Sequence, residues 1–538
     1  MNQDQNNPYG NPYNQNELMQ LNPAYEYDLS NIQYRPMTVD QWAQIPNNQS
    51  YYSQYWENPT CFEPTQFATN MKAETKYYDS KYSILFIINL IITIILIVFL
   101  AFTFKVEMLQ NFFKDDGFNS TQTMEYNKGG VDQQEVHVTY FSSLRIPFFL
   151  SLFISFCINI IHFTYAHFCS QFYIKFGMIV GVTLSVLSGV ISLLFGGVFQ
   201  MISSILIIAL SIIWYCVIRT RIPFSASIFK ITTKLVLDNP SIILVCFLES
   251  FLNVIINFGY LFVCICTAVM NLSAFWYVYS VFSYTWITLT ISYVIYMTGA
   301  GVAASWYFLQ GTEYYPSSPT WSSLKRSLTT SFGSCSLAGF ILAVIEAIRS
   351  IIKLMENSTR EHENDRDDDR PGEACSNIIS AIFHCIALCI LNILESLVKW
   401  ITRYALIYCA MYGIPYEEGC RRWAELEFTR FVNVLIDGCV IKDSMTYNSI
   451  VFIVATGFIS FSLSLIFYSV SSTETILIII MSVIFTFVGL TFLNDPVITM
   501  SDTLLVCFAE SPDTLKNSNA DLHDTLSRTY TNQLNARL

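Results

Sequence analysis

Ten long runs of apolar residues constrain the fold of this chain more than any other feature of its sequence. A helix needs about 20 predominantly apolar residues to cross the hydrocarbon core of a bilayer, and each run is that long. The runs lie at 83–104, 147–168, 176–196, 199–218, 241–268, 278–303, 330–352, 376–396, 447–470 and 474–493. Uneven apolar character continues to Gly413, so the eighth run could include a re-entrant segment. The sequence therefore predicts an all-α polytopic membrane protein with about ten transmembrane helices.

The composition supports this class and narrows the possible partners. Hydrophobic residues make up 53% of the 538 residues and charged residues only 13%, about half the charged share of a typical soluble domain. The net charge is −12, which is not a signal for binding nucleic acid. We therefore predict the lipid bilayer as a partner and no nucleic acid. The oligomeric state is left open.

Lys and Arg residues in the short loops predict the orientation, because cytosolic loops carry an excess of both. Placing the N-terminus in the cytosol puts most of these residues on the cytosolic side and leaves many acidic residues in outer loops at about 105–146 and 354–375. An even number of spans returns the C-terminus to the cytosol. Glycosylation sequons at Asn119, Asn271 and Asn357 then lie in outer loops, as glycan acceptors require.

Three segments differ in kind from the transmembrane domain, which we place at 81–495. Residues 1–80 are rich in Asn, Gln, Tyr and Pro and predict a disordered cytosolic tail. Residues 416–443 show helical periodicity of apolar positions with charges mostly off that face, which predicts an amphipathic helix on the cytosolic surface. Residues 496–538 predict a polar cytosolic tail.

The sequence carries no familiar catalytic signature. We find no G-x-S-x-G elbow, no phosphate-binding G-x-x-x-x-G-K-[ST] loop and no H-E-x-x-H. The cysteine spacings match no zinc pattern. We therefore predict no enzyme activity, no cofactor and no metal.

Polar residues inside the spans are candidates for function, since an ionisable group within a membrane is rare and usually marks a site. Glu249, Asn253 and Asn257 are spaced i, i+4 and i+8, so they share one helical face. No Lys or Arg lies within a turn of Glu249. The alternative is a carboxylate that only bonds a neighbouring helix. For Glu346 with Arg349 and Glu395 with Lys399, the local cations favour a structural role.

The sixth span offers aromatic rings that could complement such a carboxylate. Trp286, Tyr293 and Tyr296 lie along one region of the predicted helix. Aromatic faces bind quaternary ammonium groups through cation–π attraction. Packing or interfacial roles are the alternative. Further along, Gly299 and Gly301 predict either a close approach of another backbone or a helix break that acts as a hinge.

Several short motifs resemble the choline transporter-like family. They are WYF closing the sixth span, FGS opening the seventh, the segment up to Gly413, and DTLLVCFAE after the last span. The motif residues are Trp306, Tyr307, Phe308, Gly333, Ser334, Gly413, Asp502, Thr503, Cys507, Phe508 and Glu510. The match runs in order over roughly 220–512. The first outer loop is short and lacks Cys, which is similar to the fungal Pns1-like branch of the family.

This resemblance implies a ten-span carrier in the plasma membrane or an organellar membrane. Its substrate would be a small organic cation, choline or a related amino-alcohol, moved by alternating access. With Trp286, Tyr293 and Tyr296 as cage residues, Glu249 would supply the counter-charge. The alternatives are a carrier of a different solute and a non-transporting membrane scaffold or lipid-handling protein.

Overall fold

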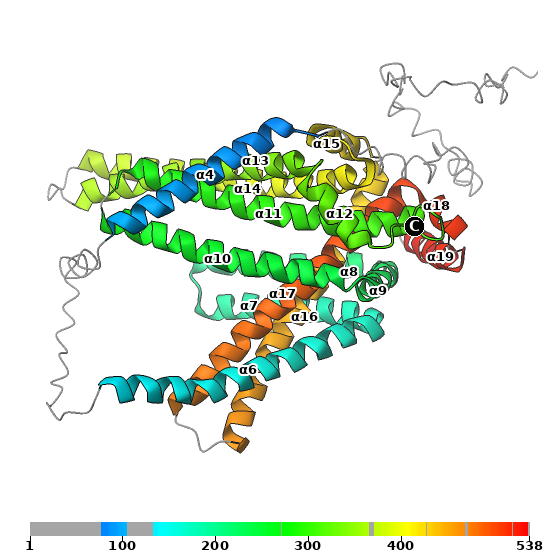
Figure 1. Ribbon diagram of the computed structural model, residues 1–538, viewed down its shortest axis with the longest axis horizontal. Helices are drawn as coiled ribbons and strands as arrows, with labels where there is room; N and C mark the ends of the chain where they lie inside the picture. The colour runs from blue at the N-terminus through cyan, green and yellow to red at the C-terminus, as the bar shows by residue number, and fades with distance from the viewer. Residues whose placement is uncertain are drawn as a thin grey trace, which may run out of the picture. The chain divides into compact units, whose positions relative to one another are not determined.

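A computed structural model describes residues 77–104, 133–270, 272–364, 371–426, 428–467, 472–518 and 520–535. Every regular element in these segments is an α-helix (Figure 1). The helices are α4 (Ser80–Thr103), α6 (Gln133–Phe168), α7 (Ser170–Phe195), α8 (Val198–Ile218), α9 (Ile222–Asp238), α10 (Ser241–Val269), α11 (Ala274–Leu309), α12 (Pro319–Leu328), α13 (Phe332–Asn364), α14 (Pro371–Tyr412), α15 (Tyr416–Glu425), α16 (Phe428–Phe467), α17 (Ser472–Glu510), α18 (Pro512–Ser518) and α19 (Ala520–Asn535). The predicted all-α class is confirmed.

Ten of these helices are long and apolar enough to cross a membrane, as the sequence predicts. Helix α4 shows why the chain needs a bilayer. It exposes Ile87, Ile91 and Ile94 by about half of each side chain, but buries Asn89 and Thr93. Those two polar residues bond the hydroxyl of Ser283 in α11, at 3.0 and 2.6 Å. Apolar side chains outside and bonded polar groups inside are what lipid as a solvent selects, so this is an integral membrane protein.

Several boundaries differ from the predicted ones. Residues 133–146, predicted as loop, already belong to α6, because no Gly or Pro interrupts the helix between 133 and Pro147. Helix α14 runs unbroken from Pro371 to Tyr412, so the eighth span holds no re-entrant segment. Helix α17 continues to Glu510 and is followed by α18 and α19, so the predicted tail 496–538 is largely helical.

The surface helix predicted at 416–443 is wrong as a single element. The chain forms the short α15 and then starts α16 at Phe428. Other apolar residues of this stretch pack inside the protein, since Val434, Val440 and Ile441 are buried. Asp437 lies on the same stretch and pairs with Arg221 at 3.4 Å, both almost fully buried.

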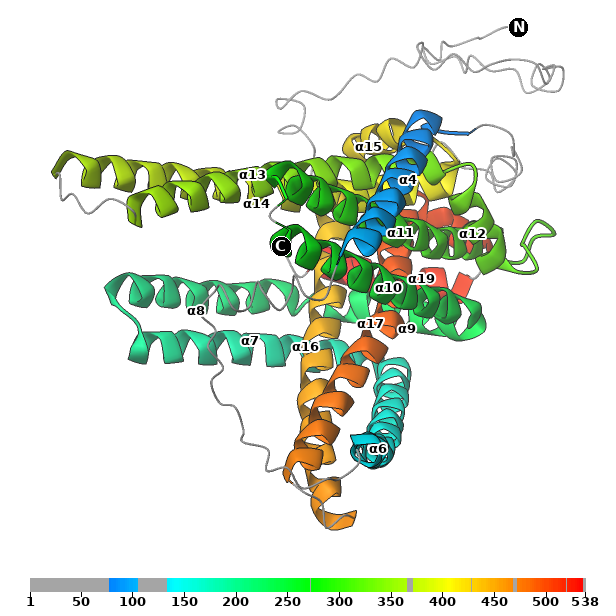
Figure 2. The same ribbon diagram turned by 60° about the vertical axis from the view of Figure 1, so that its left-hand side comes forward.

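Small residues let helices approach closely in α7, and they do so in α11 as predicted. A β-carbon added at Gly177 would lie 2.5 Å from the Ser444 carbonyl oxygen, and one at Gly181 would lie 2.3 Å from the Tyr447 ring. Both partners belong to α16, which packs along α7. Figure 2 shows α16 and α17 side by side, and likewise α13 and α14. Helix α11 contacts α10, α12, α13, α14 and α17, which makes it the central helix of the bundle.

The predicted helix break at Gly299 and Gly301 is corrected, because α11 is continuous through both residues. The close-approach alternative is observed instead. An added β-carbon at Gly301 would lie 2.7 Å from Ser323 Oγ of α12, and one at Gly299 would lie 3.0 Å from Thr499 Cγ2 of α17. Both glycines therefore serve packing in this conformation.

Some predictions fall on residues that the structure does not describe. The tail at 1–76, the sequon residues Asn119 and Asn271, and residues 105–132 and 365–370 of the two predicted outer loops lie outside the described residues. The rest of the second loop belongs to the ends of α13 and α14. The side chain of Asn357 does so as well.

Candidate functional site

The predicted polar face of α10 is turned toward α11. Glu249 Oε1 accepts a hydrogen bond from Ser292 Oγ at 2.6 Å. Two turns along, Asn257 Oδ1 accepts from Tyr284 OH at 2.7 Å, and its amide donates to the Asn253 carbonyl at 2.7 Å. The Asn253 Oδ1 atom is buried without a hydrogen-bond partner. The i, i+4, i+8 spacing thus gives a continuous polar seam between the two helices.

Glu249 forms no ion pair among the described residues, which makes it unusual for a half-buried carboxylate in a membrane helix. A second carboxylate, Asp495 of α17, lies close enough to Glu249 for their charges to interact. The buried thiol of Cys246 interacts with both carboxylates. Two acidic groups without a dedicated cation form a local negative field at the α10–α17 contact.

Asp495 was missed by the sequence reasoning because the last span was ended at residue 493. The structure extends that helix past Asn494, Asp495 and Pro496. A proline inside a helix removes one backbone hydrogen bond, and Asn494 uses its amide to bond Ser449 Oγ of α16 at 2.8 Å. The signal that could have found Asp495 is a charged residue directly before a proline in an otherwise apolar run.

A second charged cluster joins α14, α16 and α17. Arg403 Nη1 lies 3.4 Å from Asp502 Oδ2; the Arg403 side chain is 33% exposed and that of Asp502 4%. Gly438 of α16 makes room for this pair, since a β-carbon there would lie 3.1 Å from Asp502 Oδ1 and 3.3 Å from Tyr404 OH. Lys442, one turn further along α16, interacts electrostatically with Arg403 and Asp502.

The two clusters share one electrostatic environment. Asp495 interacts with Arg403 and Lys442 as well as with Glu249, and Lys442 also interacts with Asp443. Carboxylates therefore outnumber cations in this region of the bundle. The carboxylates are Glu249, Asp443, Asp495 and Asp502, and the cations are Arg403 and Lys442. An excess of negative charge inside a bundle favours binding of a cation.

The three predicted ring residues separate into two places. Tyr293 and Tyr296 lie beside the charges: both interact electrostatically with Arg403, and Tyr296 does so with Asp502. The Tyr296 hydroxyl is buried and interacts with the Asp502 carboxylate. Trp286 instead packs in a cluster of rings with Phe86, 5.8 Å away, and Phe340, 5.1 Å away.

The polar end of Trp286 is also engaged. Its indole N–H donates to the Ser336 backbone oxygen of α13 at 2.9 Å, and the residue is 3% exposed. Gly339 of α13 permits this contact, since an added β-carbon would lie 2.8 Å from Thr290 Oγ1. Trp286 therefore fixes α11 against α13.

The last motif of the chain holds α17 against α14 at the predicted cytosolic end. Glu510 accepts from Tyr408 OH at 2.8 Å and from Tyr412 OH at 3.1 Å. Asp502 and Glu510 are eight residues apart and so share a face of α17. This face meets Tyr404, Tyr408 and Tyr412, which recur every four positions along α14. The WYF motif adds a further contact at this end, because Tyr307 OH donates to the Ser511 carbonyl at 2.8 Å.

The FGS motif anchors the start of α4. A β-carbon at Gly333 would lie 2.3 Å from the Tyr78 carbonyl oxygen, so only glycine fits there. The carboxylate of Asp79 accepts from Ser334 Oγ at 2.7 Å and from the Tyr416 backbone N–H at 3.0 Å. Asp79 thus ties the beginnings of α4, α13 and α15 together.

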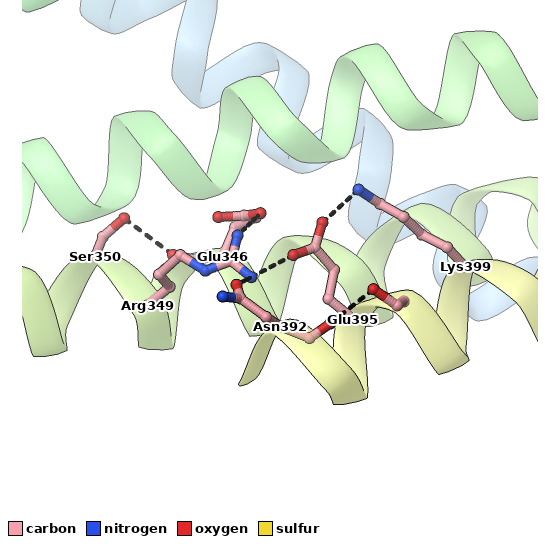
Figure 3. Close-up of polar contacts among 7 residues, drawn as sticks. Glu346, Arg349, Ser350, Asn392, Glu395 and Lys399 are labelled. Atoms are coloured by element: carbon pink, nitrogen blue, oxygen red, sulfur yellow. Dashed lines mark hydrogen bonds and ion pairs between the residues drawn. The ribbon is translucent and has the colours of Figure 1, made fainter. Parts of the chain in front are cut away.

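A network between α13 and α14 contains the other predicted ion pairs (Figure 3). Arg349 bonds Glu346 at 2.5 Å on its own helix and Glu395 across the helix contact, and Lys399 also pairs with Glu395. Asn392 Oδ1 accepts from Arg349 at 3.0 Å. The local pairs Glu346–Arg349 and Glu395–Lys399 are therefore confirmed. Two carboxylates meet two cations, so the network is balanced in charge.

Arg326 is a partly buried cation outside the spans. Arg326 of α12 lies against Gly301, where an added β-carbon would be 2.8 Å from its Nη2 atom. Burial lowers the pKa of Arg326 to about 10. Because this pKa stays well above neutral pH, the Arg326 guanidinium remains cationic beside Gly301 of α11.

Comparisons with known proteins agree with the motifs. A family model described as plasma-membrane choline transporter matches residues 202–513, more than half of the chain. The chain is 33% identical over 257 residues to Protein PNS1 of Neurospora crassa, covering 47% of this chain and 44% of that protein. It is 25% identical over 327 residues to a CTL-like protein of Dictyostelium discoideum, covering 59% and 54%.

A third relative is named Choline transporter-like protein 2, also from Dictyostelium discoideum. It is 26% identical over 239 residues, covering 43% of this chain and 35% of that protein. The first two alignments span about half the length of the relatives they match.

Proposed function

Because the chain belongs to the choline transporter-like family, we propose that it is a carrier of a small organic cation, choline or a related amino-alcohol. The observation that supports this most directly is the half-buried carboxylate of Glu249, which has a serine partner but no cation. An ionisable group in that situation is costly in a membrane. A cationic substrate would supply the missing charge.

The neighbouring residues suit the rest of such a substrate. Asp495 adds a second negative charge close to Glu249. The rings of Tyr293 and Tyr296 offer faces for an ammonium group, worth about 2 kcal/mol when the group is desolvated. The unpartnered Oδ1 of Asn253 can bond the polar end of an amino-alcohol.

In this proposal, the remaining predicted residues shape the site rather than touch substrate. Trp286 holds α11 against α13, and Asn257 joins α10 to α11 through Tyr284. Both contacts fix the helices that carry Glu249 and Tyr293. A binding residue needs such support to keep its geometry.

Alternating access would require the predicted cytosolic end to open. The bonds from Tyr408 and Tyr412 to Glu510, together with the Arg403–Asp502 pair, close α14 against α17 at that end. We propose that these contacts break and reform during transport, and that α11 moves around the close-packed Gly299 and Gly301. Interfaces of this kind have two discrete arrangements rather than a continuous range.

The test is uptake of labelled choline into proteoliposomes, with ethanolamine as competitor and empty vesicles as the baseline. We compare the unchanged chain with Glu249→Gln, Ser292→Ala and the control Glu313→Gln, which alters an exposed loop carboxylate. We expect saturable uptake that Glu249→Gln removes and Glu313→Gln preserves. Monodisperse elution and equal insertion establish that each variant is folded.

Two other results would change the proposal in different ways. Choline uptake that survives in Glu249→Gln would keep the carrier and discard Glu249 as the counter-charge. Absence of saturable uptake by folded, inserted protein would contradict the choline carrier and favour another solute or a scaffold role.

A further inference from the structure

A cavity of 480 Å³ lies among α9, the ends of α6 and α11, and the C-terminal helix α19. Its volume falls within the range of roughly 300 to 1,000 Å³ that small-molecule sites occupy. It is separate from the site proposed above, because none of the charged residues of that site lines it. The lining combines three kinds of residue: two lysines, several hydrogen-bonding groups and an apolar wall.

The lysines give the cavity its chemistry. Lys230 and Lys234 are spaced i, i+4, so both ammonium groups lie on the face of α9 that lines the cavity. Neither forms an ion pair among the residues that the structure describes. His167 of α6 stands beside them, with its Nδ1 3.2 Å from Thr233 Oγ1. Two unpaired ammonium groups at one opening are suited to an anion.

Other residues of the lining can accept hydrogen bonds from a ligand. Gln310, at the end of α11, lines the cavity, and its Oε1 atom is buried without a hydrogen-bond partner. Asp238 adds a carboxylate at the same cavity. These acceptors match hydroxyl or amine donors on a ligand whose anionic part reaches the lysines.

The apolar wall and its position indicate where the ligand comes from. Trp306 and Leu522 line the cavity together with Ile231 and Leu235. Trp306 lies three residues before the end of the span that closes at Leu309, which is the depth at which tryptophan contacts lipid headgroups. The cavity thus opens where phosphate groups of a bilayer are concentrated.

We propose that this cavity binds a phosphate-bearing ligand, of the kind that a membrane phospholipid headgroup or free phosphate presents. The ligand bridges α9, α11 and α19, because Leu522 and Thr525 of α19 complete the lining. Occupancy therefore fixes the C-terminal helix against the transmembrane bundle. This is a site for a regulator or a structural lipid, distinct from the transported solute.

The test measures thermal unfolding of the purified full chain in detergent with two probes. One probe is inorganic phosphate, and the other is mixed micelles containing phosphatidic acid, with phosphatidylcholine micelles as the reference. The variant is Lys230→Gln/Lys234→Gln. The matched control is Lys175→Gln/Lys325→Gln, which changes two other exposed lysines on α7 and α12.

We expect phosphatidic acid to raise the unfolding temperature of the unchanged chain and of the control variant. In Lys230→Gln/Lys234→Gln, half-maximal stabilisation should need about tenfold more lipid, since two partly exposed charge contacts are lost. Slower hydrogen exchange in α19 upon lipid addition should accompany the shift and should be lost in the same variant. A response to inorganic phosphate alone would identify free phosphate as the source and keep the site.

Two outcomes overturn the proposal. One is no response to either probe. The other is an equal response of both double variants, which would mean that general surface charge, not this cavity, attracts the lipid. Choline uptake plays no part in the readout, so the two proposals can fail independently.

Discussion

The bundle contains two intramembrane groups of charges that differ in how they are compensated. Between α13 and α14, Arg349 lies between Glu346 and Glu395, and Lys399 pairs with Glu395 as well. Between α10 and α17, Glu249 and Asp495 approach each other, and Glu249 has the neutral partners Ser292 and Asn253 but no ion pair. The first group is balanced within the protein. In the second, Arg403 and Lys442 interact with Asp495, but Glu249 forms no ion pair among the described residues. A carboxylate that the protein leaves without a cation is the better candidate for a cationic substrate.

The largest effect should come from neutralising the uncompensated carboxylate. Glu249→Gln keeps the shape and can still accept from Ser292, but it removes the charge. Losing one partner of a desolvated charge contact is worth about 3 kcal/mol, roughly a hundredfold in uptake efficiency. The measurement is initial uptake rate against choline concentration in proteoliposomes.

The stability of Glu249→Gln sharpens the comparison. Because no protein cation loses its partner, the unfolding temperature should stay the same or rise. A large drop in stability with normal uptake would show that Glu249 is a structural residue, as are the carboxylates of the balanced network.

The opposite pattern is expected for Arg349→Met. This change leaves Glu346 and Glu395 facing each other without the central guanidinium. The Arg349 side chain is 14% exposed, so we expect a loss of about 2 kcal/mol, somewhat below that of a fully buried pair. Thermal unfolding in detergent measures it.

A compensating variant tests the cause. Glu346→Gln/Arg349→Met/Glu395→Gln removes the charges together and should recover most of the lost stability. Uptake per folded molecule should be unchanged in both variants. Failure of the triple variant to recover would show that packing of the Arg349 side chain, rather than charge balance, holds α13 against α14.

A smaller effect is expected where α14 meets α17. Tyr408→Phe removes the hydroxyl that donates to Glu510 at 2.8 Å while keeping the ring. The second donor, Tyr412, remains in place. We expect a loss of about 1 kcal/mol in stability, measured by thermal unfolding. Tyr165→Phe is the control, since it removes a half-buried tyrosine hydroxyl on α6. Equal losses of stability in both variants would show that the hydrogen bond to Glu510 adds nothing specific.

The spans and the local ion pairs could be predicted from sequence because they depend on neighbouring residues. A long apolar run predicts a membrane span without any knowledge of the other helices. The pairs Glu346–Arg349 and Glu395–Lys399 are three and four residues apart, so each lies on one face of its own helix. The close packing of Gly177 and other small residues also follows from local spacing. Each of these features lies within one helix.

Contacts between helices far apart in the chain could not be predicted in the same way. Arg403 and Asp502 are 99 residues apart, and no periodicity links them. Asp495 lies beyond the apolar run 474–493 that predicts the last span, whereas the helix continues through Asn494, Asp495 and Pro496. At 416–443, helical periodicity was real but could not say whether the apolar face meets lipid or protein. The candidate site is made of such contacts, and so its composition needed the structure.

The smallest effect should come from the outer arm of the balanced network. The Lys399 side chain is 51% exposed, and Glu395 keeps Arg349 when the lysine is removed. Lys399→Gln should therefore lower stability by only about 0.5 kcal/mol, as for an exposed i, i+4 pair. Thermal unfolding at low and high salt measures it, and the difference from the unchanged chain should shrink as salt screens the pair. A loss as large as that of Arg349→Met would show that Lys399, and not the guanidinium, balances the carboxylates. The network would then be nearly as open in charge as the group around Glu249, and the contrast between the two regions would fail.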